Sequence, residues 1–221
     1  MTPGNLFHAI LLNNNNNFVV RLFRNNAGWS DFCGLDINWL FMKSIPVKII
    51  LISLLVLFIT GCKKNYVISE KQQILFQLDY INYAWGYHHS GYIIDNFGNV
   101  MTYNNPENWI FPDKDFGISA NQVSENLSKC RQSGKKISKE ELQKYTNYIK
   151  NIASSKVTAL KNVAADAGSS EFICYQFSES SLTYKGSLIK MEGDFTRENL
   201  NFHSKKVAAW MKEINFSLPK N

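Results

Sequence analysis

The chain is poor in the residues and motifs from which most active sites are built. Among its 221 residues there are four histidines and four cysteines. It contains no glycine-rich phosphate loop, no GxSxG nucleophile motif, no HExxH metal motif and no CxxC pair. His88 and His89 are neighbours, and on a strand they would point to opposite faces and could not readily bind one metal ion together. The sequence therefore identifies no metal ligands, no cofactor and no catalytic residues.

Long apolar runs are scarce as well, and the most continuous one spans residues 49–59, interrupted only by Ser53. It is about half as long as the ~20 residues that a membrane-spanning helix needs. Lys43 and Lys48 precede this run, and two further lysines at 63 and 64 follow it. A short apolar core behind a positively charged start is typical of a signal peptide, and the flanking lysines argue against an uncleaved membrane anchor.

The run ends in Ile59-Thr60-Gly61-Cys62. This segment resembles the lipobox of bacterial lipoproteins, and the resemblance covers residues 42–62 only. It implies a signal peptide over 42–61, a diacylglycerol on the thiol of Cys62, and cleavage just before that cysteine. The implied partner is a membrane, on which the N-terminal lipid would hold the protein. Two or more acyl chains are enough to anchor a protein stably.

Residues 1–41 show no sustained hydrophobic period and include five consecutive asparagines at 13–17. Such a run buries no apolar surface but carries the full entropy cost of ordering the backbone. We expect either a disordered leader or, as the preferred interpretation, a translation start at Met42, where the signal peptide begins.

The residues after the lipobox indicate where the protein is located. In lipoproteins of the kind that this sequence resembles, Asp directly after the lipidated cysteine often holds the protein at the inner membrane, and here that position is Lys63. We therefore expect an envelope protein on the outer membrane of a host that has two membranes. Residues 62–221 carry 20 lysines and arginines against 16 acids, a modest excess, and an exported protein is not expected to meet nucleic acid.

Two cysteines remain after the lipobox, Cys130 and Cys174. In an oxidising compartment they could pair, and closing a loop of this length would stabilise the protein by roughly 4 kcal/mol. The alternative is two buried thiols.

The mature chain is predicted to be a short tether over 62–73 and a single α+β domain over 74–218. Residues 92–95 and 99–103 flank Asn-Phe-Gly, which predicts a β-hairpin with Gly98 in the turn. Residues 74–84 favour a strand, although their spacing also suits a helix. Ser119 and Ser138 each begin a capping-box pattern, and Asn201 or Ser204 could cap a last helix. With strands also expected over 171–177 and 182–191, we predict an antiparallel sheet packed with about three helices.

The most unusual segment is residues 85–92, which combine aromatic residues, glycines and both neighbouring histidines. Two interpretations stay open. Trp85, Tyr87, His88 and His89 could form an exposed platform for a glycan or peptide, or the segment could be a bulged strand whose aromatic side chains fill the core. Asp194 follows a glycine and is expected in a turn.

These patterns favour a lipid-anchored, non-catalytic binding or accessory protein of the cell envelope, whose partner is an envelope protein or a glycan. One alternative is an inhibitor or immunity lipoprotein. Another is a small envelope hydrolase that uses His88 or His89 with Asp194. A cleft with a histidine–carboxylate pair would favour the hydrolase, whereas an exposed aromatic patch would favour the binding roles.

Overall fold

The computed structural model describes residues 7–14, 17–24 and 65–219. The predicted signal peptide and Cys62 lie outside these ranges. No helix within them is long and apolar enough to cross a membrane. The chain divides into two units, Met1–Lys63 and Lys64–Asn221, which are described separately.

The first unit contains a β-hairpin in a region for which a disordered leader was one of two expectations. Strand β1, Phe7–Asn14, pairs antiparallel with β2, Asn17–Arg24, and Asn14 lies opposite Asn17. The correction has a local explanation, because apolar, strand-favouring residues flank the asparagine run and asparagine is common in tight turns.

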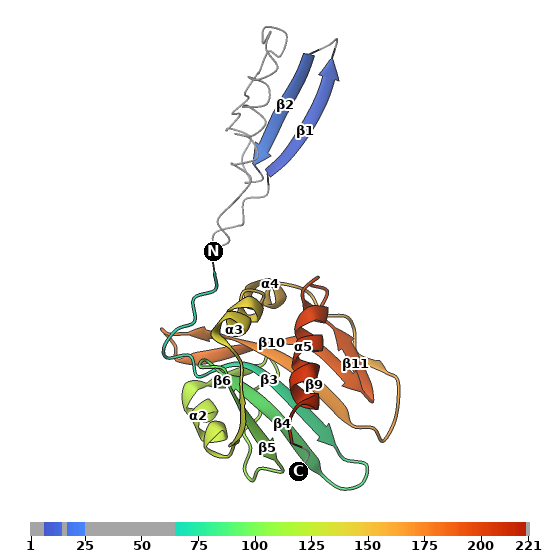
Figure 1. The fold of residues 1–221 in the computed structure, drawn as a ribbon. Coiled ribbons are helices and arrows are strands. Elements are labelled where there is room, and N and C mark those ends of the chain that lie inside the picture. Colours follow the sequence, from blue (N-terminus) through green and yellow to red (C-terminus); the bar gives the residue numbers. More distant parts are fainter. Residues whose placement is uncertain (1–6, 15–16, 25–64, 220–221) are drawn as a thin grey trace. The chain divides into compact units, whose positions relative to one another are not determined.

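The second unit is an α+β domain built on one large antiparallel sheet, as predicted (Figure 1). The strand order is β7-β5-β4-β3-β9-β10-β11-β8, and the short β6 pairs with β10. The strands are β3 (Ile74–Asn82), β4 (His88–Asp95), β5 (Asn99–Asn104), β6 (Gly117–Ser119), β7 (Arg131–Lys136), β8 (Lys161–Asn162), β9 (Ser169–Ser178), β10 (Thr183–Gly193) and β11 (Phe195–Glu198).

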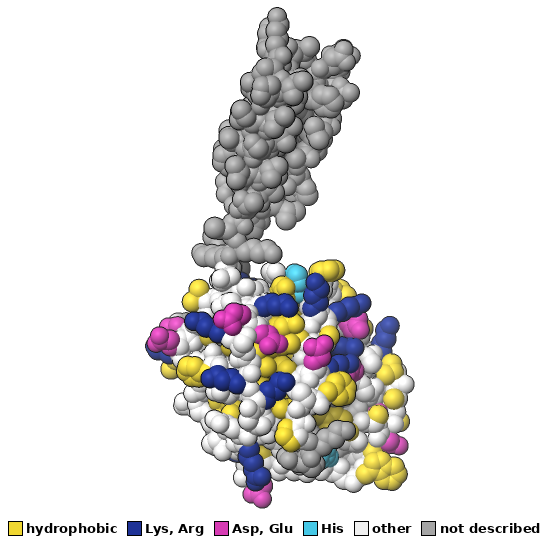
Figure 2. Space-filling model, viewed as in Figure 1, with side chains coloured by type: hydrophobic (Ala, Val, Ile, Leu, Met, Phe, Trp, Pro, Cys, Tyr) yellow, Lys and Arg dark blue, Asp and Glu magenta, His cyan; other side chains and the backbone are white. Residues whose placement is uncertain are grey.

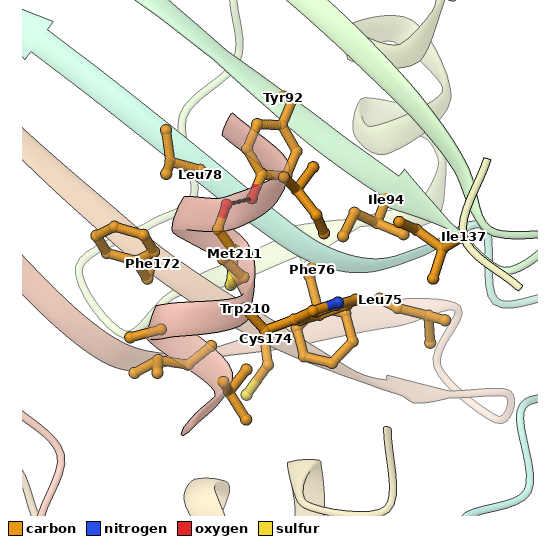
Figure 3. Close-up of a cluster of buried hydrophobic side chains, with 14 of the residues drawn as sticks. Leu75, Phe76, Leu78, Tyr92, Ile94, Ile137, Phe172, Cys174, Trp210 and Met211 are labelled. Atoms are coloured by element: carbon orange, nitrogen blue, oxygen red, sulfur yellow. Dashed lines mark hydrogen bonds between the residues drawn. The ribbon is translucent and has the colours of Figure 1, made fainter. Parts of the chain in front are cut away.

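Three helices pack against one face of this sheet: α3 (Lys139–Thr146), α4 (Ile149–Ala153) and α5 (Ser204–Phe216). Their apolar residues meet those of β3, β4 and β9 in the larger core cluster, part of which is drawn in Figure 3. Trp210 of α5 packs edge-on against Phe76, and the hydroxyl of Tyr92 donates to the carbonyl of Met211 at 2.6 Å. These contacts hold α5 firmly on the sheet.

The opposite face is covered only in part, by helix α2, Ala120–Ser128, and by the loop that precedes β6. A second, smaller core cluster lies here and includes Ile93, Tyr103 and Val123, with Trp109 and Ile110 of the loop packed against it. The loop therefore clamps the core at these two residues. Phe111 beside them is 46% exposed.

Several local predictions are confirmed. Strands β4 and β5 form the predicted hairpin, and Gly98 in its turn has a φ of +83°, which a residue with a side chain rarely adopts. The capping box at Ser119 is complete. At Ser138 only half of the box is made, because the side chain of Glu141 instead accepts a hydrogen bond from Trp210 at 2.7 Å. Residues 74–82 form a strand, with β4 and β9 on either side.

Other predictions need correction. Residues 131–136, for which no strand was predicted, form β7, which pairs with β5. Helix α5 begins after His203, which makes no side-chain cap, whereas Asn201 accepts from the backbone of His203 at 2.9 Å. The tether is shorter than predicted, because Tyr66 packs on the core and Gln72 is 1% exposed.

Of the two alternatives for Cys130 and Cys174, the disulfide is not formed: both are free thiols, Cys174 buried and Cys130 half-buried. Cys174 belongs to the core cluster beneath the three helices, whereas Cys130 packs against the cluster on the other face of the sheet. Burial raises the pKa of each thiol to about 12, so neither is an active nucleophile at neutral pH.

Candidate binding site at the β3–β4 connection

The connection between β3 and β4 carries three exposed aromatic side chains. Tyr83, Trp85 and Tyr87 are 73%, 89% and 51% exposed, and we call them the aromatic tip. Figure 2 shows hydrophobic side chains at the lower right edge of the domain, where Figure 1 places this connection. The tip residues therefore do not fill the core, which decides between the two interpretations of Trp85 and Tyr87. Large aromatic side chains grouped in solvent are typical of contact surfaces.

The two neighbouring histidines point to opposite faces of β4, as the strand period predicts. His88 lies on the helix-covered face, where its ring is 5.8 Å from that of Tyr80. His89 lies on the other face and is 0% exposed. Of the four predicted ligand-binding residues, Trp85 and Tyr87 are exposed, His88 is half-buried and His89 is fully buried.

His89 belongs to a buried hydrogen-bond network that the sequence did not reveal. Its Nε2 lies 2.6 Å from Oδ1 of Asp79 on β3, and the hydroxyl of Tyr103 donates to the same oxygen at 2.6 Å. Gln77 extends the network, since its amide donates to Tyr103 and accepts from Tyr175. Burial, and then the charge of Asp79, raise the pKa of Tyr103, which stays a neutral donor.

The network requires a glycine at position 91. A Cβ there would lie 2.0 Å from the carbonyl oxygen of Leu78 and 2.5 Å from the hydroxyl of Tyr103. Gly91 therefore gives Tyr103 the space to reach across β4 to Asp79.

The contacts of His89 do not resemble those of a catalytic base. Its Nδ1 is buried and has no hydrogen-bond partner within residues 65–219. The ring is surrounded by aromatic side chains, with ring centres 5.4 Å from Trp109 and 5.1 Å from Phe111. No serine, threonine or cysteine of that range hydrogen-bonds it, so no activated nucleophile is formed there. In the tautomer with hydrogen on Nε2, His89 instead positions Asp79.

Asp194 is not the partner of either histidine. Its two carboxylate oxygens accept from the backbone amides of Ala167 at 2.9 Å and Gly168 at 3.0 Å. This confirms the predicted turn role and removes the acid proposed for the hydrolase. The histidine–carboxylate pair that the structure does contain, His89–Asp79, is buried.

Next to the aromatic tip, the sheet face opens into a cleft of about 190 Å³. Asp79 and Ile81 of β3 and Glu171 of β9 form part of its base, and Phe111 of the preceding loop forms part of its wall. The ring centre of Tyr87 lies 6.1 Å from that of His89, which lies 5.1 Å from that of Phe111 in the cleft wall. The aromatic tip and the cleft are therefore neighbours.

Two acidic side chains of the cleft lie opposite each other on neighbouring strands, since Asp79 pairs with Glu171 in the β3–β9 register. Burial, and next the charge of Asp79, raise the pKa of Glu171. Asp113 also lines the cleft, and backbone amides of Gly117 and Asp115 lower the pKa of its carboxyl. Like charges directly opposite destabilise a sheet, so this arrangement favours a positively charged group between them.

A second hollow, of about 240 Å³, lies between β10 and α5 and differs in its charges. Lys190 and Lys212 line it, and both form ion pairs with Glu192, at 3.0 and 2.7 Å. Its charges are thus already paired with each other, whereas no basic side chain lines the cleft of Asp79 and Glu171.

Sequence reasoning located the aromatic tip but missed Asp79, Tyr103 and Glu171. These residues lie far apart along the chain, and only the pairing of β3 with β4 and β9 brings them together. A polar residue within the apolar run 74–81 was the one available signal. No protein-family model, no curated protein and no solved structure matches this chain.

Proposed function

We propose that the protein is a lipid-anchored, non-catalytic binding module of the bacterial cell envelope that contacts a partner protein through the aromatic tip. The observation that carries this proposal is the exposure of Tyr83, Trp85 and Tyr87 together on one strand connection. Tryptophan and tyrosine dominate the energetics of protein interfaces, because their side chains bury a large area at low entropy cost. The lipid anchor rests on the lipobox at 59–62.

The position of the tip in the domain suits an anchored protein. Asn147, beside α3, accepts from the backbone amide of Tyr66 at 2.7 Å, so the chain enters the domain there. Figure 1 places the β3–β4 connection at the other end of the sheet. A lipid on Cys62 would hold the α3 end towards the membrane and leave the tip free for a partner.

A protein partner is favoured over a glycan by the charged cleft beside the tip. Asp79 and Glu171 are carboxylates in a cleft that no basic side chain of the domain lines, and basic side chains of a protein would complement them. An inhibitor or immunity lipoprotein is one form of this function, distinguished by whether the partner is an enzyme that loses activity on binding.

Site-specific crosslinking in native membranes tests the proposal. p-Benzoylphenylalanine at Tyr83 is expected to give one discrete protein adduct, and Trp85→Ala in the same chain is expected to reduce its yield about tenfold or more. The matched control places p-benzoylphenylalanine at Phe202, which is 77% exposed and lies next to α5.

Identical adducts from positions 83 and 202, or an adduct that does not depend on Trp85, would contradict the proposal. Absence of a protein adduct combined with retention of the protein on purified envelope polysaccharide would identify a glycan-binding module instead.

A further inference from the structure

The cleft beside the aromatic tip is lined by three carboxylates, those of Asp79, Asp113 and Glu171, and by no basic side chain. Glu171 makes no side-chain hydrogen bond or ion pair with any residue between 65 and 219. Asp79 is 7% exposed, and both of its hydrogen bonds go to Oδ1. The partners are Tyr103 and His89, so Oδ2 receives neither of these hydrogen bonds.

The free oxygen of Asp79 is the second feature that points to a ligand. No residue of the described domain hydrogen-bonds its Oδ2, although the side chain is more than nine-tenths buried and lines the cleft. Oδ2 itself is not fully buried, so it reaches the cleft and can accept a hydrogen bond from a ligand there. The buried network of His89, Tyr103 and Gln77 fixes Asp79 in this place, which is how a binding group is positioned in advance.

The walls of the cleft indicate which cation would fit. Among the residues described, no group of three or more histidines, cysteines and acids could hold a metal ion. Phe111, Phe116, Ile81 and Ile173 line the cleft together with the acids. Aromatic faces attract organic cations, and apolar side chains contact the alkyl part of a long basic side chain.

The size of the cleft further limits the kind of ligand that it can receive. Its volume of about 190 Å³ is below the roughly 300 Å³ at which small-molecule sites begin, so it suits one side chain better than a whole ligand. We propose that the cleft receives an arginine or lysine side chain of the protein that contacts the aromatic tip. This inference rests on the proposed function and adds the chemistry by which the partner is recognised.

The first test uses defined peptides and the full-length protein in detergent micelles. We expect Ac-Gly-Arg-Gly-NH₂ to shift the backbone amide resonances of Ile81, Ser169 and Phe172, with a Kd of about 1 mM or tighter. The citrulline peptide has nearly the same shape without the charge, and it is expected to bind about tenfold more weakly. A lysine peptide measures the preference between the two cations.

The second test removes the charge with little change of shape. Glu171→Gln is chosen because Glu171 has no partner within the domain, so the variant is expected to fold, whereas Asp79→Asn would disturb the buried network. We expect Glu171→Gln to weaken binding of the arginine peptide about fivefold or more and to leave binding of the citrulline peptide unchanged. Ser169→Lys, which places an ammonium group beside the cleft, should weaken the arginine peptide as well.

Equal binding of the arginine and citrulline peptides would overturn the inference, as would resonance shifts produced equally by magnesium or calcium ions. The two proposals fail separately. If Trp85→Ala abolishes the crosslinked adduct but Glu171→Gln and Ser169→Lys leave it unchanged, the tip binds a partner without a basic side chain in the cleft. If the arginine peptide binds but the adduct is independent of Trp85, the cleft binds a basic side chain and the proposed role of the aromatic tip is wrong.

Discussion

Replacing Glu171 by glutamine is expected to stabilise the protein at neutral pH, although it changes a residue of the candidate site. Burial disfavours the charged form of Glu171, and Asp79 lies directly opposite on the neighbouring strand. Its pKa in the folded protein is therefore raised above the value of 4.5 that an unperturbed glutamate has. Folding thus favours the protonated side chain.

The sign of the pH dependence follows from this direction. The contribution of protonated Glu171 to stability is fully present below pH 4.5 and is lost as the pH rises through the folded pKa. At pH 7 the charged side chain faces Asp79 across the sheet and Asp113 in the cleft, and Arg197 offsets part of this repulsion. Glutamine retains the shape and removes the charge.

The expected gain in the free energy of unfolding at pH 7 is about 0.5–1 kcal/mol. This is the repulsion between two like charges at opposite positions of neighbouring strands, reduced by the attraction of Glu171 to Arg197. For a domain of this size the gain corresponds to an increase in Tm of about 1–4 °C. Urea denaturation at pH 7 and pH 4 measures it, with Glu213→Gln as the control, because Glu213 is an exposed acid on α5. A gain that persists at pH 4, or that Glu213→Gln reproduces, would refute the reasoning.

Three further predictions concern the rest of the chain. Gly91→Ala is expected to destabilise the domain by about 1–3 kcal/mol in urea denaturation, since the added Cβ would clash with Leu78 and Tyr103, whereas Ser90→Ala on the same strand should have a small effect. Cys130 and Cys174 are expected to react slowly with a thiol reagent in the native protein and quickly in denaturant, and reductant should leave the unfolding midpoint unchanged. A chain that starts at Met42 should give the same mature protein as the full chain, and its intact mass should show acylation that Cys62→Ser removes; an unchanged mass in that variant would end the lipoprotein interpretation.

The elements that could be predicted from sequence are those whose signals are local. The β4–β5 turn depends on Gly98, and the start of α2 depends on Ser119 and Gln122, three positions apart. Strand β7 was missed because its six residues, Arg131–Lys136, contain no apolar side chain. It forms as a charged edge strand, a position where polar residues prevent pairing with other chains.

The two parts of the candidate site also differ in how far they could be predicted from local sequence. The aromatic tip is a run of neighbouring residues, so composition alone drew attention to it. The cleft depends on the registers of β3 with β9 and of β3 with β4, and on a loop that packs over them. The hydrolase alternative paired a histidine with Asp194, which is conspicuous in its turn. The carboxylate that His89 contacts is instead Asp79, which lies inside a largely apolar strand.

The short tether leads to a prediction about orientation on the membrane. Because Asn147 accepts a hydrogen bond from the backbone amide of Tyr66, three residues lie between Cys62 and this fixed point, and the four steps from 62 to 66 span at most about 14 Å. An anchored domain would therefore rest close to the lipid headgroups with its α3–α4 end, and the aromatic tip would face away. Both native thiols are buried or half-buried with a pKa of about 12, so one introduced cysteine can be labelled selectively.

A fluorophore at Lys150→Cys, on α4, should be quenched by headgroup nitroxides in vesicles that carry the lipidated protein. The same fluorophore at Trp85→Cys should not be quenched, because it lies at the other end of the sheet. Stronger quenching at position 85 than at position 150 would mean that the aromatic tip enters the bilayer, and its exposed side chains would then be a membrane contact and not a protein-binding surface.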